Sequence, residues 1–521
     1  MTTPPPWPHQ QAVFDKTKDL ACFGLFAEPR TGKTRIVLMK AAWRYHHRDL
    51  KTLFIFAPNG VHRNWITDEI PKWLDTTTNP RCFIWRSAKA GLKSTTRELA
   101  ALRAHKGLVV IASNIDAITN PKLHKWLQLL RMRGPAYAVV DESADIANMT
   151  AQRTKAMLRW RDIFEWREVL DGTPMAENPL EIYAQAEFLK YAALGYTSFI
   201  AFKYRYAIIK KRPLPGAGNT PHAACGGIGC PACGYIGMAP GRTFDQIVGY
   251  QNQEELKAKL ARFSVVIKRK DCVDLPEKIY AKRYYPLSPE QRRVYDDLKK
   301  QYAAELNDGR HVTAALVLTR YLRLQQVCHN FWPEAKEALV HAACQGEGCA
   351  QCGGLGVVVN KIPLTIIDSN NSPRLDVLEA ELKREPGQAT IWTTYHQDSN
   401  VLCERLKDCV RYDGTVKEEQ RAENKRLFQK REVRWLVGNP AAGGRGLDFS
   451  NANAMFFYGH TWRARVRGQA EDRGESLSRK VSTVITDIVA EDTVDEEFLA
   501  AHVVKKGLSE FLMADSGWRR L

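Results

Sequence analysis

The segment 27–34, AEPRTGKT, combines residue types that can bind phosphate. It follows the apolar run LACFGLF, so a strand would end in a loop that opens a helix, where backbone N–H groups receive phosphate oxygens. Lys33 would reach the β- and γ-phosphates, the Thr34 hydroxyl would ligate Mg²⁺, and Gly32 would let the backbone come close. Arg30 and Thr31 complete the predicted loop. Ala27 stands where the first glycine is usual, so the loop alone leaves a chance GKT at a helix start open.

An acidic pair further along the chain supplies the complementary chemistry. YAVVDES (137–143) places Asp141 and Glu142 at the end of an apolar run. Asp141 would bind Mg²⁺, directly or through water, and Glu142 would polarise an attacking water. An exposed acidic pair at a strand end is the simpler alternative. The loop and the pair together, in this order, predict ATP hydrolysis with ATP and Mg²⁺ bound.

Two cysteine-rich patches repeat the spacing HxxC-x4-CxxC. Their candidate ligands are His222, Cys225, Cys230 and Cys233 in the first patch, and His341, Cys344, Cys349 and Cys352 in the second. Two sets of three thiolates and one imidazole fit two structural Zn²⁺ ions, because four protein ligands leave no open position for catalysis. Each patch could close on its own ion, or the patches could exchange halves; the four-residue gap is short, which slightly favours exchange. Such insertions would contact DNA or a protein partner.

The remaining cysteines are isolated in the sequence, and we expect them to be plain core residues. They are Cys22, Cys82, Cys272, Cys328, Cys403 and Cys409.

The elements that must position these residues alternate between strand and helix. Apolar runs at 53–58, 107–113 and 137–143 read as buried parallel strands, with helical patterns at 34–46 and 94–105 between them. The same rhythm returns after Ser372, with candidate strands at 389–395, 433–438, 454–459 and 482–490. The sequence therefore predicts an α/β fold of two doubly wound lobes.

Helical and cysteine-rich insertions separate these lobes. We predict a first ATP-binding lobe at 1–190, a mostly helical insertion with the first patch at 191–275, a linker and helical insertion with the second patch at 276–371, and a second lobe at 372–521.

A series of ordered blocks resembles the Swi/Snf-like branch of superfamily 2 helicases and DNA translocases. In the first half these are WPHQQ (7–11), APNGVHRNWITDE (57–69), DESADIAN (141–148) and LDGTPMAENPLEIY (170–183). The linker VIKRKDCVDLPEK (266–278) with LSPEQRRVYDDL (287–298) is specific to that branch. YDGTVKEEQRAENKRLF (412–428), NPAAGGRGLDFS (439–450) and QAEDRGES (469–476) continue the order. The resemblance implies two RecA-like lobes with ATP bound between them.

The resemblance also implies roles for single residues. Gln10 would read adenine, Thr173 would couple the ATP site to nucleic acid, and the second lobe would add nucleotide contacts. Those contacts would come from Gly444, Gly446, Gln469 and Arg473, the last reaching the γ-phosphate. Ser476 stands where the family has a second arginine, and whether Arg479 replaces it is open. The basic run Arg463, Arg465 and Arg467 could contact ATP phosphates or DNA, or form a solvated turn.

A nucleic acid gripped across both lobes would be held mainly through its phosphates, independently of base sequence. The candidate contacts, each of which could instead be a loop cap, are Asn59, Arg63, Ser113, Asn114, Thr393 and Thr394. The net charge of +18 agrees with a polyanionic partner.

We therefore expect a DNA-stimulated ATPase that moves along duplex DNA. A strand-separating DNA or RNA helicase and a weakly active DNA-binding scaffold remain as alternatives. The chain has no apolar run of roughly 18 residues and no signal-peptide pattern, so we expect no membrane association and a place in the cytoplasm, either of a bacterium or of a virus-infected host cell.

Overall fold

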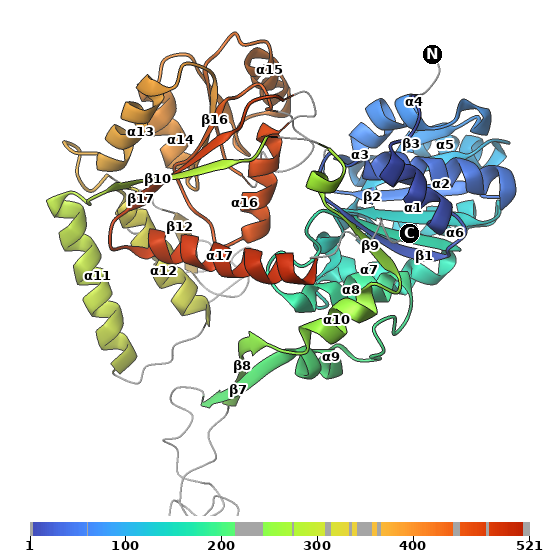
Figure 1. The fold of residues 1–521 in the computed structure, drawn as a ribbon, viewed down its shortest axis with the longest axis horizontal. Coiled ribbons are helices and arrows are strands. Elements are labelled where there is room, and N and C mark those ends of the chain that lie inside the picture. Colours follow the sequence, from blue (N-terminus) through green and yellow to red (C-terminus); the bar gives the residue numbers. More distant parts are fainter. Residues whose placement is uncertain are drawn as a thin grey trace, which may run out of the picture.

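The structure is a computed structural model, and it describes residues 4–59, 61–213, 243–273, 276–307, 314–332, 336–340, 357–361, 366–440, 449–475 and 479–513. Within these ranges the chain forms two parallel α/β sheets, which lie side by side in Figure 1.

The first sheet has the strand order β3-β4-β2-β5-β6-β1-β9, and every neighbouring pair is parallel. Its strands are β1 (Cys22–Ala27), β2 (Thr52–Ala57), β3 (Arg81–Ile84), β4 (Val109–Asn114), β5 (Ala136–Asp141), β6 (Trp166–Asp171) and β9 (Ser264–Ile267). Because side chains alternate along a strand, Phe54 and Phe56 of β2 face one hydrophobic cluster while Leu53 and Ile55 face another.

Helices cover both faces of this sheet. On one face α1 (Pro8–Thr17), α2 (Lys33–His47) and α4 (Ile70–Trp73) bury Val13, Ile36 and Ile70. Short α3 (Val61–Asn64) leads into α4. The other face packs against α5 (Lys93–Ala104), α6 (Pro121–Arg131), α7 (Gln152–Trp160) and α8 (Ile182–Leu189).

The second sheet has the order β10-β17-β16-β13-β15-β14, again parallel. Its strands are β10 (Ile279–Tyr285), β13 (Ala389–Trp392), β14 (Cys409–Tyr412), β15 (Trp435–Gly438), β16 (Ala454–Phe457) and β17 (Val484–Ala490). One face packs against α13 (Pro373–Arg384) and α14 (His396–Arg405), and the other against α15 (Glu418–Gln429) and α16 (Ala464–Glu471). Helices α11 (Pro289–Asn307), α12 (Ala314–Cys328) and α17 (Val494–Leu512) pack together beside β10 and β17.

Helix α17 also reaches the first lobe. Leu512 and Met513, at its end, belong to the hydrophobic cluster that covers one face of the first sheet. In Figure 1 the helix runs from the second lobe toward α10 (Gln253–Leu260) and α8.

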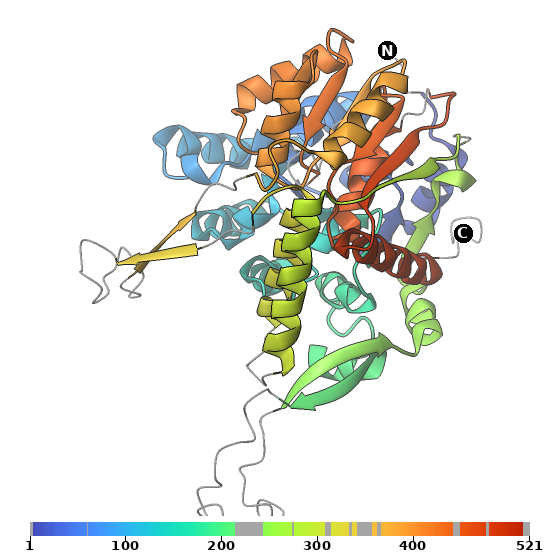
Figure 2. The ribbon, with the colours of Figure 1, turned by 90° about the vertical axis from the view of Figure 1, so that its left-hand side faces the viewer.

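Two antiparallel pairs lie outside the sheets. Strands β7 (Ala207–Pro213) and β8 (Thr243–Tyr250) form one, after α9 (Phe199–Tyr206), and β11 (Lys336–Val340) and β12 (Val357–Lys361) form the other. Figure 2 shows both pairs projecting from the lobes. Each cysteine patch lies in the sequence between the two strands of one pair, at 214–242 and 341–356, outside the described residues.

The predicted α/β class with two parallel sheets is confirmed, and it is consistent with two RecA-like lobes. The expectation of a mostly helical segment at 191–275 is correct only in part, because α9 and α10 share that segment with β7, β8 and β9. Strand β9 completes the first sheet beside β1, and β10 of the predicted linker joins the second sheet beside β17. The zinc-knuckle part of the prediction lies outside the described residues.

Candidate active site

The phosphate-type loop lies where the sequence predicts it, between the end of β1 at Ala27 and the start of α2 at Lys33. Gly32 has a left-handed φ of 84°, and a Cβ there would lie 2.2 Å from Gln10 Nε2, so a side chain would be excluded on both counts. Lys33 Nζ donates to the Ala27 carbonyl at 2.5 Å, across the loop. Thr34 is half-buried in the first turn of α2.

Gln10 and its neighbour His9 are buried against this loop. Gln10 Nε2 donates to the Thr31 carbonyl at 3.2 Å, and its Oε1 accepts from the Trp7 N–H at 3.0 Å. His9 Nε2 lies 2.8 Å from the same carbonyl, and burial lowers the pKa of His9. The structure therefore joins Gln10 to the loop. The sequence analysis missed His9, which had no signal beyond its position next to Gln10.

The acidic pair lies at the end of β5, next to two more carboxylates. Asp141 accepts from Trp65 Nε1 at 3.0 Å, and burial together with the adjacent Glu142 raises the pKa of Asp141 to about 6. Asp171, at the end of β6, accepts the backbone N–H groups of Ala144 and Thr173, each at 2.8 Å. Burial raises the pKa of Asp171 as well.

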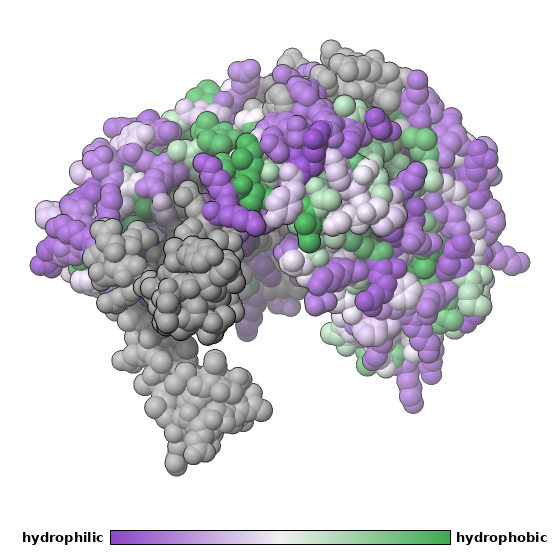
Figure 3. All heavy atoms as spheres, turned by 90° about the horizontal axis from the view of Figure 1, so that it is seen from below, coloured by the Kyte–Doolittle hydropathy of each residue, from purple (hydrophilic) through white to green (hydrophobic). Residues whose placement is uncertain are grey.

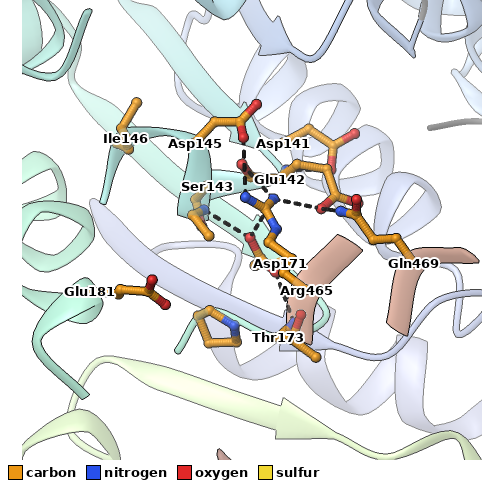
Figure 4. A network of polar contacts seen from close by, with 12 residues as sticks. Asp141, Glu142, Ser143, Asp145, Ile146, Asp171, Thr173, Glu181, Arg465 and Gln469 are labelled. Carbon is orange, nitrogen blue, oxygen red and sulfur yellow. Dashed lines mark hydrogen bonds and ion pairs between the residues drawn. The ribbon is translucent and has the colours of Figure 1, made fainter. Parts of the chain in front are cut away.

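Glu142 has φ 54° and ψ 54°, a left-handed conformation that is uncommon for a residue with a Cβ and is found in strained functional turns. The turn aims the Glu142 side chain away from the sheet and toward the second lobe, as Figure 4 shows.

Two side chains of α16, in the second lobe, reach this acidic group. Arg465 Nη2 lies 2.9 Å from Glu142 Oε2 and 3.5 Å from Asp171 Oδ2, while its Nη1 lies 3.1 Å from Asp145 Oδ1. Gln469 Nε2 donates to Glu142 Oε2 at 2.9 Å. Residues 465 and 469 are one turn apart and share a helix face. The predicted Gln469 thus meets the predicted Glu142 across the lobes (Figure 4).

Arg473 and Arg479 lie elsewhere in the second lobe. Arg473 is 5% exposed, and its Nε donates to the Gln469 carbonyl at 3.0 Å. Arg479 Nη1 donates to the carbonyls of Ser450, Ala452 and Gly474, at 2.7–2.9 Å. The guanidinium of Arg479 therefore holds backbone of its own lobe. Gly444 and Gly446 lie outside the described residues.

A chain of hydrogen bonds connects the acidic turn to the segment around Thr173. Ser143 Oγ donates to Gln185 Oε1 at 2.6 Å, and Gln185 Nε2 donates to the Pro174 carbonyl at 2.8 Å. Together with the Thr173 N–H on Asp171, this fixes the turn after β5 to the turn after β6. Ser143, where the family usually has alanine, thus has a defined structural role.

The six candidate nucleic-acid contacts differ in exposure. Asn59 is exposed and Arg63 half-buried at the start of α3. Ser113 is 2% exposed, and Asn114 Oδ1 accepts the Ala117 N–H at 2.9 Å as a turn cap.

The two second-lobe candidates make contacts within their own lobe. The buried Thr393 hydroxyl lies 2.9 Å from Ser399 Oγ, and Thr394 Oγ1 donates to the His460 carbonyl at 3.2 Å. Of the six candidates, Asn59 therefore has the exposed side chain, while Arg63, Asn114 and Thr394 are half-buried.

The described residues contain no group of three or more His, Cys, Asp or Glu side chains arranged to hold a metal ion. The eight predicted zinc ligands lie outside these residues. Within the described part of the chain, no helix has the length and apolar character needed to cross a bilayer.

Comparison with known families agrees with this geometry. Residues 17–331, more than half of the chain, match the SNF2-related domain, and residues 373–475 match the helicase conserved C-terminal domain. These two domain matches define a helicase-type ATP hydrolase. The chain belongs to the SNF2-related family, the Swi/Snf-like branch of superfamily 2, and ATP and Mg²⁺ are the ligands typical of that family.

Several curated proteins are similar to the chain. It is 22% identical over 387 residues to the putative ATP-dependent helicase/translocase YwqA of Bacillus subtilis, covering 73% of this chain and 36% of that protein. It is 23% identical over 562 residues to the human helicase-like transcription factor, covering 88% of this chain and 50% of that protein. The chain thus spans about a third to a half of the length of these relatives.

Among solved structures, the Sulfolobus solfataricus SWI2/SNF2 ATPase core in complex with dsDNA has 17% sequence identity and a TM-score of 0.39, covering 98% of this chain and 96% of that one.

Proposed function

We propose that the chain is a DNA-stimulated ATPase that couples hydrolysis to movement along duplex DNA. The observation that carries the proposal is the contact of Glu142, in the first lobe, with Arg465 and Gln469 of the second lobe. Because the residue that would activate water is bound by the opposite lobe, a change at the nucleotide changes the contact between lobes. Lobe movement of this kind is how such motors step along a strand.

Lys33, Thr34, Asp141 and Glu142 form the proposed reaction site. Thr34 and Asp141 fit a magnesium site, because the buried Asp141 carboxylate shares its surroundings with Glu142 and Asp171; bound Mg²⁺ would neutralise phosphate charge. Glu142 accepts a proton from the attacking water. The water oxygen bonds to the γ-phosphorus while the bond from that phosphorus to its bridging oxygen breaks, and ADP and phosphate leave. Lys33 stabilises the phosphate charge.

The second lobe would add Gln469 to this site. Gly444, Gly446 and Arg473 are the other nucleotide contacts proposed for that lobe. Gln10 and His9 support the loop through Thr31, and the loop itself includes Arg30 and Gly32. Arg473 remains a proposed nucleotide contact, although in this arrangement it lies against its own helix.

Nucleic acid binding is proposed from charge and surface. The net charge is +18, and the face seen in Figure 3 is mainly hydrophilic, with small scattered hydrophobic areas. Asn59 and Arg63 are the proposed first-lobe contacts, and Ser113, Asn114, Thr393 and Thr394 would contribute through the loops that they hold. The relative from Bacillus is named a putative ATP-dependent helicase/translocase, which supports the same class of activity.

An ATPase assay with no nucleic acid, duplex DNA, single-stranded DNA or RNA tests the proposal. We expect duplex DNA to stimulate turnover most, and the stimulation to weaken steeply as salt is raised. Displacement of a third strand from a triplex would demonstrate movement on duplex. Equal turnover with and without every nucleic acid would contradict the motor, and unwinding of a labelled fork would favour a strand-separating helicase instead.

We also propose that the two cysteine patches each contribute to structural Zn²⁺ sites at the β7–β8 and β11–β12 pairs, where they would contact DNA or a protein partner. The repeated HxxC-x4-CxxC spacing supports this. Metal analysis of freshly purified protein should find two zinc ions per chain. Replacing Cys225 by serine should release one ion if each patch closes alone, and should disturb both patches if they exchange halves.

A further inference from the structure

Arg465 differs from the other arginines around the QAEDRGES block in what it binds. Arg467 pairs with Asp487 at 2.5 Å and with Glu471 at 2.7 Å, inside the second lobe. Arg479 holds backbone carbonyls of that lobe. Arg465 instead leaves its own lobe and lies among carboxylates of the first.

Arg465 is held in place by burial and by a backbone hydrogen bond to the first lobe. Its side chain is 13% exposed, and the first-lobe residue Glu177 accepts its backbone N–H at 3.3 Å through Oε1. Burial disfavours the charge on Arg465, but Asp171, Glu142 and Asp145 outweigh burial and raise its pKa. The guanidinium is therefore a permanent positive charge at the acidic turn.

This contact occupies the oxygen that hydrolysis needs. Glu142 Oε2 accepts from both Arg465 and Gln469, at 2.9 Å each, so its lone pairs are committed to the second lobe. A planar guanidinium binds phosphate as well as carboxylate. The charge of an arriving γ-phosphate would compete for Arg465, and the transfer would free Glu142 to accept a proton from water.

We infer that Arg465 is the arginine through which the second lobe serves hydrolysis, in place of the position held by Ser476: it holds Glu142 without nucleotide and moves to the γ-phosphate when ATP binds. The inference uses ATP hydrolysis by this chain and is independent of whether the chain moves along DNA.

The test compares kcat and KM for ATP in the full chain and in Arg465→Ala, Arg465→Lys and Arg384→Ala, with and without duplex DNA. We expect Arg465→Ala to lower kcat about 100-fold, as loss of a group that stabilises transition-state charge does. The kcat of Arg465→Lys should stay well below that of the unaltered chain, because an ammonium group cannot make the bidentate contact that a guanidinium makes. Arg384, the last residue of α13 in the same lobe, has a side chain 76% exposed; it is the matched control and should keep its kcat.

The outcomes separate the possible failures. Unchanged melting with a reduced kcat in Arg465→Lys supports the inference even if Arg465→Ala folds poorly. A kcat of Arg465→Ala within about threefold of the original overturns it. A raised kcat would show that Arg465 only restrains Glu142, which also overturns the phosphate role. If DNA fails to stimulate any variant but Arg465→Ala still lowers basal turnover, the motor proposal fails and this inference stands.

A second observation is independent of the ATP site. Cys403, in α14, and Cys409, the first residue of β14, have Sγ atoms 3.2 Å apart, and both side chains are half-buried. The expectation that these cysteines are isolated core residues is wrong, because the turn between α14 and β14 brings them together. A disulfide bond is about 2.05 Å long, so the sulfurs need to approach by only about 1 Å.

We propose that Cys403 and Cys409 form a reversible dithiol–disulfide modification site, oxidised by a small disulfide such as that of glutathione. The hydrogen bond from Cys409 lowers the pKa of Cys403, which makes Cys403 the attacking thiolate. Attack forms a mixed disulfide and releases one glutathione thiolate. The Cys409 thiolate then attacks the sulfur of Cys403 and expels the second, so that the protein loses two electrons and the reagent gains them.

Incubation of the full chain with oxidised glutathione, acid quenching, alkylation and peptide mapping test the site. We expect a linked 403–409 peptide about 2 Da lighter than the dithiol form, reversed by dithiothreitol. Cys409→Ser should stop at the Cys403 mixed disulfide. Full alkylation of both cysteines after treatment, or a stable mixed disulfide in the unaltered chain, would overturn the proposal.

Discussion

Two clusters of oppositely charged side chains join the lobes, and the pKa values of their carboxylates shift in opposite directions. At the acidic turn Asp141, Glu142, Asp145 and Asp171 of the first lobe face Arg465 of the second. At the linker Glu471, Asp472 and Glu475 of the second lobe face Arg269, which follows β9, and Lys278, which precedes β10.

The pKa values show the difference. Burial raises the pKa of Asp141 and of Asp171. Burial would also raise the pKa of Asp472, but Lys278 and Arg269 outweigh it and hold that pKa below its usual value. The linker cluster is compensated by its own cations, whereas the acidic turn keeps a surplus of negative charge. A surplus of buried carboxylate is the surrounding that a divalent cation requires, so the first cluster suits chemistry and the second suits attachment.

We expect the largest effect, a fall in kcat, from replacing Lys33 beside the acidic turn. Lys33→Ala removes the cation that faces Asp141 and would bind ATP phosphates, and we expect kcat to fall by roughly 1,000-fold or more. Steady-state phosphate release measures this. Lys93→Ala, an exposed lysine at the start of α5, is the control and should keep its turnover. Turnover of Lys33→Ala near that of the control would show that the loop is not a phosphate site.

A stability effect should dominate at the linker cluster. Lys278 Nζ lies 3.1–3.6 Å from three carboxylates with a side chain 16% exposed, so Lys278→Ala leaves partly buried acids without this cation. We expect a loss of about 2 kcal/mol in the free energy of unfolding, measured by urea denaturation. Lys282→Ala, exposed on β10, should cost much less. The comparison fails if Lys278→Ala keeps full stability while losing kcat as Arg465→Ala does.

The smallest effect is a pH dependence beside the acidic turn. Burial raises the pKa of Glu181 to about 7, compared with about 4.3 when unfolded. Stability from this group is therefore fully present below about pH 4.3 and is lost as pH rises through about 7. Glu181→Gln keeps an acceptor for the Glu177 N–H. It should be more stable than the original by on the order of 1 kcal/mol at pH 8, and about equally stable at pH 4. Thermal melting at both pH values measures this, and an equal shift at both would contradict it.

Sequence reasoning located the elements that have local signals. The apolar runs predicted the strand before Lys33 and four strands after Ser372, and the helical patterns predicted the helices at 33–47 and 93–104. Strands β3 and β14, of four residues each, and β6, which begins with Trp-Arg-Glu, were not predicted, because their polar residues make these segments resemble loops. Strand β9 escaped because a hairpin and a helix separate it from the sheet that it completes.

The active-site residues also divide into those with a local sequence signal and those whose partners are distant in the chain. Lys33, Asp141 and Glu142 could be predicted from the sequence because each belongs to a short motif that directly follows an apolar run. Arg465 was noted within a basic run, but its carboxylate partners lie 294 or more residues away along the chain. Only the packing of two lobes could assign it. The helical spacing of Arg465 and Gln469 was the one local signal that linked the arginine to a predicted site residue.

The end of α17 gives the lobes a further point of attachment, besides the linker cluster and the acidic turn. Leu512 and Met513 are buried in the hydrophobic cluster of the first lobe. Pulling both into water would cost roughly 3–6 kcal/mol. A rigid body pinned at two separate points can turn only about the line that joins them. While the linker and α17 attachments hold and the acidic-turn contact is released, the second lobe is therefore left with a single angle of rotation. Nucleotide-driven motion then takes the form of a rotation about that line rather than a free separation.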